Sequence, residues 1–145
     1  MSLRHLLLSL ALVAGIFALA GCKKAVQYKE YKVLISPDRS EYTLESDGRA
    51  YVNFKVKIYI DGVEVRDYED NRVECEITAQ GGTVSETVRR SGKQGDVYTT
   101  FYPADPENFT GGSVVAKPVT LLCKGLSFTN FSGDKSASVT IKPAL

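Results

Sequence analysis

Residues 50–60, AYVNFKVKIYI, decide the fold class, because their side chains alternate between apolar and polar in steps of two. Asn53, Lys55 and Lys57 fall on one side of that alternation. The apolar residues at every second position are Ala50, Val52, Phe54, Val56, Ile58 and Ile60. A period of two is typical of a strand that buries one face, so this stretch predicts a long, half-buried β-strand.

The same alternation recurs along the chain. Residues 72–79 (RVECEITA) place Val73, Cys75, Ile77 and Ala79 inward and the polar residues between them outward. Further strands are predicted at residues 31–36, 96–102, 118–124 and 137–142. In the strand at 118–124, Val119, Leu121 and Cys123 share a face, so Cys75 and Cys123 are both expected to point into the core.

Turn signals separate these strands. Asp-Gly occurs at 47–48 and 61–62, and Gly-Gly occurs at 81–82 and 111–112. No window beyond the first 22 residues shows a helical apolar period. Several short strands punctuated in this way predict an all-β, antiparallel β-sandwich, with a small barrel as the second architecture. The longest loop is expected at residues 103–117.

The first 22 residues have the pattern of an export signal. A short polar start, Arg4-His5, precedes the uncharged run of residues 6–19. This run is shorter than the roughly 20 apolar residues of a permanent transmembrane helix, but it suits the apolar segment of a signal peptide. The motif Leu19-Ala20-Gly21-Cys22 follows and resembles the lipobox of bacterial lipoproteins. Residues 1–21 are therefore predicted to be a lipoprotein signal peptide, and Cys22 is predicted to be acylated.

An acylated Cys22 would anchor the mature chain to a membrane without spanning it, because each buried methylene contributes about 0.8 kcal/mol. Lys23 follows the cysteine directly. By resemblance to enterobacterial lipoproteins, a residue other than aspartate there implies transfer to the bacterial outer membrane, on its periplasmic or its surface side. Residues 22–30 are expected to form a lipidated tether, and residues 31–145 a single folded domain.

Charge and composition narrow the function classes. Removing the first 21 of the 145 residues leaves 124 residues, a length that fits one domain with a sizeable core. Processing removes Arg4 and the only histidine, so the 18 basic residues become 17, against 17 acidic residues. This balance argues against a nucleic-acid-binding protein, which needs a basic face to neutralise phosphates.

Cys75 and Cys123 are the cysteines of the mature chain besides the anchor. In an oxidising envelope, a single remaining pair predicts one disulfide. That bridge would close a loop of about 48 residues, worth roughly 4 kcal/mol in the chain-entropy model. A metal or redox pair is disfavoured, because no histidine remains and no Cys-x-x-Cys motif occurs.

Asp47-Gly48-Arg49-Ala50 opens the strand at 50–60, and Gly95 precedes the strand at 96–102. This order resembles the bacterial immunoglobulin-like domains repeated in invasins and intimins, in which a D-G-x-A stretch opens the second strand. The resemblance covers residues 31–142 and implies an immunoglobulin-like β-sandwich over residues 31–145. It also implies that the third and penultimate strands are sheet neighbours, which would make the Cys75–Cys123 bridge a cross-strand one.

Motifs that carry catalysis are missing from the mature sequence: there is no histidine, no Gly-x-Ser-x-Gly elbow and no phosphate-cradling loop. No catalytic residue, metal or cofactor is therefore predicted. The stretch DYEDN at 67–71 supplies oxygen ligands suited to calcium, but its spacing does not match the twelve-residue helical loop, so we interpret it as a solvated acidic turn. Arg89, Arg90 and Lys93 form a basic turn, interpreted as a soluble hairpin tip rather than an anionic contact.

Tyrosine is the one residue type that suggests recognition, because it is enriched where proteins meet. A structural role for these side chains is nevertheless the preferred interpretation. Tyr51 and Tyr59 alternate with Val52 and Ile58 and should therefore lie on the outer face of their strand. The tyrosines in question are Tyr28, Tyr31, Tyr51, Tyr59, Tyr98 and Tyr102.

Two function classes follow. The first is a non-catalytic, membrane-anchored immunoglobulin-like module that scaffolds or contacts another envelope or surface protein. The second is a periplasmic enzyme-inhibitor or ligand-binding lipoprotein with a small β-barrel fold. A protruding loop that fits an enzyme cleft would favour the second class, and a sandwich with flat, tyrosine-rich faces would favour the first.

Overall fold

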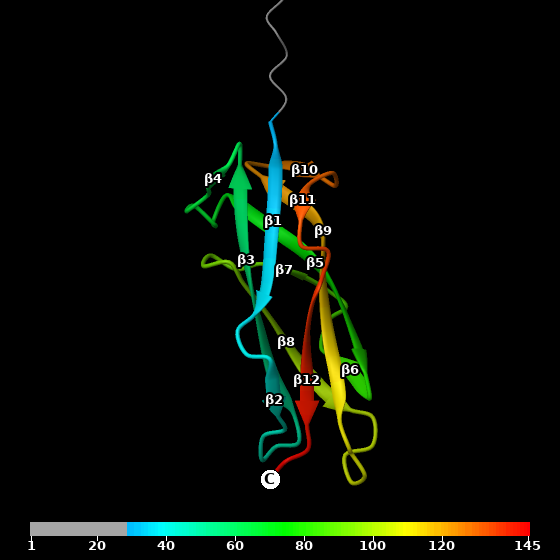
Figure 1. Ribbon diagram of the computed structural model, residues 1–145. Helices are drawn as coiled ribbons and strands as arrows, with labels where there is room; N and C mark the ends of the chain where they lie inside the picture. The colour runs from blue at the N-terminus through cyan, green and yellow to red at the C-terminus, as the bar shows by residue number, and fades with distance from the viewer. Residues whose placement is uncertain (1–28) are drawn as a thin grey trace, which may run out of the picture.

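The computed structural model describes residues 29–145, so the predicted signal peptide, Cys22 and most of the predicted tether lie outside the described residues. Across residues 29–145 the regular structure consists of twelve strands and no helix. The strands form two six-stranded sheets whose apolar faces enclose a common core (Figure 1). The predicted all-β sandwich is confirmed.

The first sheet contains the strand that decided the fold class. Its strands follow the order β11-β1-β3-β8-β6, and β4 pairs with the end of β3. Only the short pairing of β1 with β11 is parallel. The strands of this sheet are β1 (Tyr31–Pro37), β3 (Ala50–Ile60), β4 (Val63–Glu64), β6 (Gly82–Val84), β8 (Asp96–Pro103) and β11 (Ser132–Gly133).

The second sheet has the order β2-β12-β9-β5-β7, with β10 paired to the end of β9. The pairing of β2 with β12 is parallel, and the others are antiparallel. The strands of this sheet are β2 (Glu41–Thr43), β5 (Asn71–Gln80), β7 (Val88–Arg90), β9 (Gly112–Cys123), β10 (Leu126–Phe128) and β12 (Ala137–Lys142).

The strand order is that of an immunoglobulin-like sandwich. The adjacent strands β1, β3, β8 and β6 correspond to strands A, B, E and D, and β5, β9 and β12 correspond to C, F and G. The chain crosses from the first sheet to the second between β1 and β2, and β7 extends the second sheet beyond β5. The fold class therefore rests on connectivity as well as on strand content.

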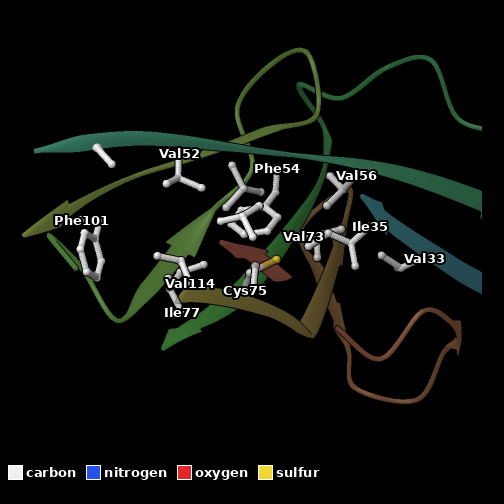
Figure 2. Close-up of a cluster of buried hydrophobic side chains, with 14 of the residues drawn as sticks. Val33, Ile35, Val52, Phe54, Val56, Val73, Cys75, Ile77, Phe101 and Val114 are labelled. Atoms are coloured by element: carbon white, nitrogen blue, oxygen red, sulfur yellow. The ribbon is translucent and has the colours of Figure 1, made fainter. Parts of the chain in front are cut away.

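The core lies between the two sheets and is formed by the inward faces of the long strands. Figure 2 shows Phe54, Val73 and Cys75 gathered between strands of the two sheets. Phe54 and Phe101 are the largest side chains that are completely buried. At roughly 1.5–3 kcal/mol for each fully buried large aliphatic or aromatic side chain, this burial is the main stabilising contribution to the fold.

Five of the six predicted strands match the structure closely. The strand at 50–60 has the predicted bounds, and so does the strand at 137–142. The strands predicted at 31–36, 72–79 and 96–102 are each extended by one or two residues in β1, β5 and β8. The short strands β2, β4, β6, β7, β10 and β11 were not predicted, because pieces of two or three residues carry no alternation.

The prediction for the fifth strand, and with it the long loop at 103–117, was wrong. Strand β9 begins at Gly112, so only residues 104–111 connect β8 to β9. A proline inside a strand is unexpected, because it cannot donate to a sheet ladder. In the structure, Pro118 is buried in mid-strand opposite Cys75, at a β-bulge where the register shifts between Glu74 and Cys75. Because of the bulge, Val119 does not lie on the inward face as predicted, and its side chain is half-buried.

The predicted disulfide was also wrong. Strands β5 and β9 are neighbours, but Cys75 lies opposite Pro118 whereas Cys123 lies opposite Asn71. Those two positions are four residue steps apart on β5, which places the cysteines roughly 13 Å apart along the strands. A disulfide needs Cα atoms within about 7 Å of each other. Both thiols are free and buried, so the inward alternation was correct while the pairing was not.

Candidate interaction surface

Two tyrosines stand out on the outer face of the first sheet. Tyr51 on β3 is 51% exposed and Tyr98 on β8 is 56% exposed. The register pairs Asn53 with Tyr98 and Tyr51 with Thr100, which makes the two tyrosines diagonal neighbours on one face. Aromatic rings on rigid strands offer contact area with little conformational entropy to lose.

The turn before β3 holds Tyr51 in place. The Tyr51 hydroxyl donates a hydrogen bond to Oδ2 of Asp47, and the N–H of Arg49 donates to Oδ1 of the same carboxylate at 3.0 Å. The bond from the Tyr51 hydroxyl lowers the pKa of Asp47 and raises the pKa of Tyr51. The Arg49 guanidinium also lies 5.2 Å from the ring centre of Tyr102, the next outward aromatic on β8.

Tyr42 connects the second sheet to this face. Its hydroxyl donates to the carbonyl oxygen of Asn53 at 3.1 Å and accepts from the N–H of Asn53 at 3.1 Å. A strand of the second sheet is thereby joined by a side chain to the backbone of β3. The Arg39 guanidinium lies 6.0 Å from the Tyr42 ring centre and covers its outer side.

A cleft of about 460 Å³ lies between these elements. Three carboxylates and one guanidinium contribute to its wall, so its lining is polar and acidic. The lining residues are Asp38, Arg39, Glu41, Tyr42, Thr43, Glu45, Tyr51, Asn53 and Tyr98. We call this cleft and the two exposed tyrosines beside it the tyrosine cleft.

The buried carboxylate of Asp96 holds one of the side chains that line the cleft. Oδ1 of Asp96 accepts hydrogen bonds from Nζ of Lys55 at 2.8 Å and from Nδ2 of Asn53 at 3.1 Å. The Lys55 bond holds the pKa of Asp96 below its ordinary value, and the same bond raises the pKa of Lys55. The hydrogen bond that the Asn53 amide donates to Asp96 fixes the Asn53 side chain, which lines the cleft.

The other tyrosines singled out in the sequence are used elsewhere. The Tyr31 ring stacks on Phe128 with 4.3 Å between ring centres. Tyr59 lies on the same outer face as Tyr51 but toward the other end of β3, with Nζ of Lys32 5.9 Å from its ring centre. Tyr28 lies outside the described residues. An aromatic recognition face was the less favoured of the two interpretations of these tyrosines, and the structure gathers only Tyr51 and Tyr98 of that set at the cleft.

The acidic stretch at 67–71 makes a turn stabilised from within. Oδ1 of Asp67 accepts hydrogen bonds from the N–H groups of Glu69 and Asp70, at 3.1 and 3.3 Å. The buried Asn71 amide donates to the carbonyl oxygen of Asp67 at 2.8 Å. Across residues 29–145, no three acidic, cysteine or histidine side chains are grouped closely enough to hold a metal ion.

The basic turn is neutralised by acidic neighbours. Arg90 pairs with Glu74 at 3.0 Å, and Lys93 pairs with Glu69 at 3.3 Å. Arg89 pairs with Glu86 at 2.7 Å, and its Nε donates to the carbonyl oxygen of Tyr98. This turn therefore presents mixed charge rather than a basic patch.

In the part of the chain from residue 29 onward, no helix is long and apolar enough to cross a membrane.

The sequence did not predict that Asn53 lines a cleft, that Asp96 is buried beside it, or that carboxylates form part of its wall. Asn53 and Lys55 were placed on the polar side of their strand, which is where they lie. Their contact with Asp96 depends on how β3 pairs with β8, 41 residues further along the chain. The nearest local signal is the Asp-Gly turn at 47–48, which predicted the bend that positions Tyr51.

Comparison with known proteins adds a likeness of fold only. No protein-family model matches the chain, and no curated protein matches it. Among solved structures, the D0–D1 domain of Intimin is similar, with 15% sequence identity and a TM-score of 0.45 over 78% of this chain. The match covers 49% of that structure, so the chain spans about half its length.

Proposed function

We propose that this chain is a lipid-anchored, non-catalytic immunoglobulin-like module of the bacterial outer membrane that binds another envelope or surface protein through the tyrosine cleft. The anchor is the acyl group expected on Cys22, and the sandwich is the binding part. The observation that carries the proposal is the placement of two exposed tyrosines beside an acidic cleft on a rigid sheet face.

The composition of the cleft indicates the chemistry of its partner. Tyr51 and Tyr98 supply aromatic contact area, and the walls supply carboxylate and amide oxygens. Tyrosine is enriched in protein interfaces, and carboxylates in a recess favour an inserted lysine or arginine. The partner segment is therefore expected to carry a basic side chain flanked by apolar or aromatic residues.

The direction of the pKa shifts supports a non-catalytic role. General acids and bases work best with a pKa near the operating pH. Within residues 29–145, every group whose pKa is clearly shifted moves away from neutrality. The pKa values of Asp47 and Asp96 fall, while that of Lys55 rises and burial raises the pKa of Cys75 to about 12.

The sandwich favours the interaction module over the enzyme-inhibitor alternative. The inhibitor alternative requires a closed small barrel with a protruding loop. The two sheets of this chain are separate, and residues 104–111 form the connection between β8 and β9. The exposed face with the tyrosines is the feature that the first alternative required.

Site-specific photocrosslinking in living cells tests the contact. A photoreactive phenylalanine replaces Tyr98 in one strain and Val88 in another, because Val88 is similarly exposed, at 55%, on the edge strand of the other sheet. We expect a discrete protein adduct from position 98 and none from position 88. An adduct from position 88 alone, or from neither position, would remove the tyrosine cleft as the binding site.

The lipid anchor has its own test. We expect Cys22→Ser to abolish acyl labelling and to leave the precursor unprocessed or soluble, because the thiol that takes the lipid is gone. The measurement is metabolic labelling with a fatty acid followed by membrane fractionation. A shortened, labelled protein that still fractionates with membranes would show that the lipobox interpretation is wrong.

A further inference from the structure

Two hairpins whose turns have closely similar φ angles lie at the end of the sandwich where the chain enters β1 (Figure 1). One joins β3 to β4 through Asp61-Gly62, and the other joins β9 to β10 through Lys124-Gly125. The φ angles are +51° and +79° in the first turn and +46° and +81° in the second. Positive φ at both central residues defines the tight type I′ turn, which makes each tip rigid.

Direct contacts tie both hairpins to the start of β1. The N–H of Glu30 donates to Oδ1 of Asp61 at 2.7 Å, and the N–H of Asp61 donates to the carbonyl oxygen of Glu30 at 2.8 Å. On the other side, the Tyr31 ring stacks on Phe128 of β10. Residues 29–31, 60–64 and 123–128 therefore form one end of the molecule, which we call the N-terminal pole.

Each hairpin presents an aliphatic side chain at the same position, directly after its turn. Val63 pairs with Ile60 and is 70% exposed, and Leu126 pairs with Cys123 and is 64% exposed. Apart from Leu145, these are the most exposed large hydrophobic residues between residues 29 and 145. A single exposed aliphatic residue is ordinary, but two at equivalent rigid tips beside the point of chain entry form a repeated feature.

The charges at the pole suit a polar–apolar boundary. Lys29 directly precedes Glu30, and Lys124 stands in the β9–β10 turn, so both lysines lie at this pole. Burial raises the pKa of the Cys123 thiol, and the positive charges of the two lysines act against that rise. Long lysine side chains extend their charge to the headgroup level while their stems lie among apolar groups. Glu30 and Asp61 are also at this pole, so attraction to anionic lipid is not its main source of affinity.

The covalent reach of the tether limits where this pole can lie. Lys29 is seven positions after Cys22, and a fully extended chain of seven residue steps spans at most about 25 Å. A lipid on Cys22 therefore keeps the N-terminal pole close to the bilayer. The two exposed tips lie at the end of the sandwich that the tether holds there.

We propose that the N-terminal pole docks on the lipid bilayer, with Val63 and Leu126 inserted at the boundary between headgroups and acyl chains. This inference rests on the proposed lipid anchor and adds an orientation to it. Tyr51 follows the start of β3, whereas Val63 follows its end, so docking would turn the tyrosine cleft away from the lipid. The acyl group would hold the domain at the membrane, and the tips would fix its direction.

Tryptophan fluorescence gives a clean test, because the chain contains no tryptophan. The mature, lipidated protein is reconstituted into phosphatidylethanolamine and phosphatidylglycerol vesicles, with or without brominated acyl chains that quench tryptophan on contact. We expect the Val63→Trp and Leu126→Trp variants to shift their emission to shorter wavelength and to lose most of it in brominated vesicles. Val88→Trp, exposed to a similar degree but in edge strand β7, is the matched control and should keep its emission.

Vesicle flotation of the same samples separates the two proposals. Protein that floats with the vesicles while positions 63 and 126 remain unquenched would overturn docking and leave the anchor in place. Protein that does not float would overturn both. An emission shift that depends on protein concentration and not on bromination would show that a second copy covers the tips, which also overturns docking.

Discussion

Asp96 is the only charged residue that is buried among residues 29–145. It accepts hydrogen bonds from Lys55 and from the Asn53 amide, and the lysine remains half exposed. Hydrogen bonds to charged groups contribute more than neutral ones, and removing one partner leaves the other unpaired. This small network links the strand pair β3–β8 to the wall of the tyrosine cleft.

We expect Asp96→Ala to lower the free energy of unfolding by about 1–3 kcal/mol at neutral pH, because the Asn53 amide loses its acceptor. The lowered pKa of Asp96 means that its stabilising effect is complete above the ordinary value of 3.8 and is lost as the pH falls through the folded-state pKa. Urea unfolding at neutral and acidic pH measures both effects. The exposed Glu107→Ala serves as the control, and an equal loss in the two variants would contradict this account.

The two buried thiols give a second expectation at this scale. Burial raises the pKa of Cys75 to about 12, so its thiolate is scarce and the folded protein should react slowly with thiol reagents. In a Cys22→Ser background, denaturation without a reducing agent should expose two reactive thiols. The unfolding midpoint should be the same with and without reductant. If both thiols react only after reduction, the two cysteines are joined by a disulfide and this expectation is wrong.

Among the elements, the β9–β10 hairpin carries the clearest local strain. Lys124 adopts φ +46° at the first central position of a type I′ turn, where asparagine, aspartate and glycine are preferred. The equivalent position in the β3–β4 hairpin is occupied by Asp61. The Asp-Gly pair at 61–62 was identified as a turn from the sequence, whereas Lys-Gly at 124–125 was not.

Lys124→Asn should raise the free energy of unfolding by up to about 1 kcal/mol, because asparagine adopts the left-handed conformation more readily than lysine. Chemical denaturation of the purified protein measures the change. Lys135→Asn is the matched control, since Lys135 is an exposed lysine without a positive φ, and it should have little effect. Equal effects at both positions would mean that turn strain is not the cause.

The whole molecule depends on its last strand. β12 pairs with β9 on one side and with β2 on the other, and its Val139 and Ile141 are buried in the core. β2 has only three residues and pairs with β12 in the second sheet, so β12 links the crossing segment to the rest of that sheet. The three residues after Lys142 are exposed.

Ending the chain after Ser136 should therefore abolish cooperative unfolding, whereas ending it after Lys142 should change stability by no more than about 0.5 kcal/mol. The single change Ile141→Ala should cost about 2–5 kcal/mol, because it leaves a cavity between the sheets. Thermal unfolding followed by circular dichroism distinguishes these outcomes. A native-like transition in the shorter truncation would show that the other strands suffice.

Much of the fold was predictable because the alternation that indicates a strand involves only residues close together in the sequence. The alternation in residues 50–60 depends on neighbours two positions apart, and it predicted the bounds of β3 and the inward direction of Phe54 and Val56. The same local pattern placed Cys75, Cys123 and the outward tyrosines on the correct faces. The export signal and the lipobox at residues 1–22 are likewise local patterns, and they stay predictions because they lie outside the described residues.

Register was decided only by the tertiary structure, because it depends on contacts between residues far apart in sequence. Alternation says which face a residue occupies but not which residue lies opposite. It therefore could not show that Cys75 faces Pro118 instead of Cys123, that a bulge admits this proline, or that Tyr98 lies diagonal to Tyr51. The sequence by itself determined an all-β chain with a half-buried strand pattern, and the packing of its two sheets determined where the thiols, the buried carboxylate and the tyrosine cleft lie.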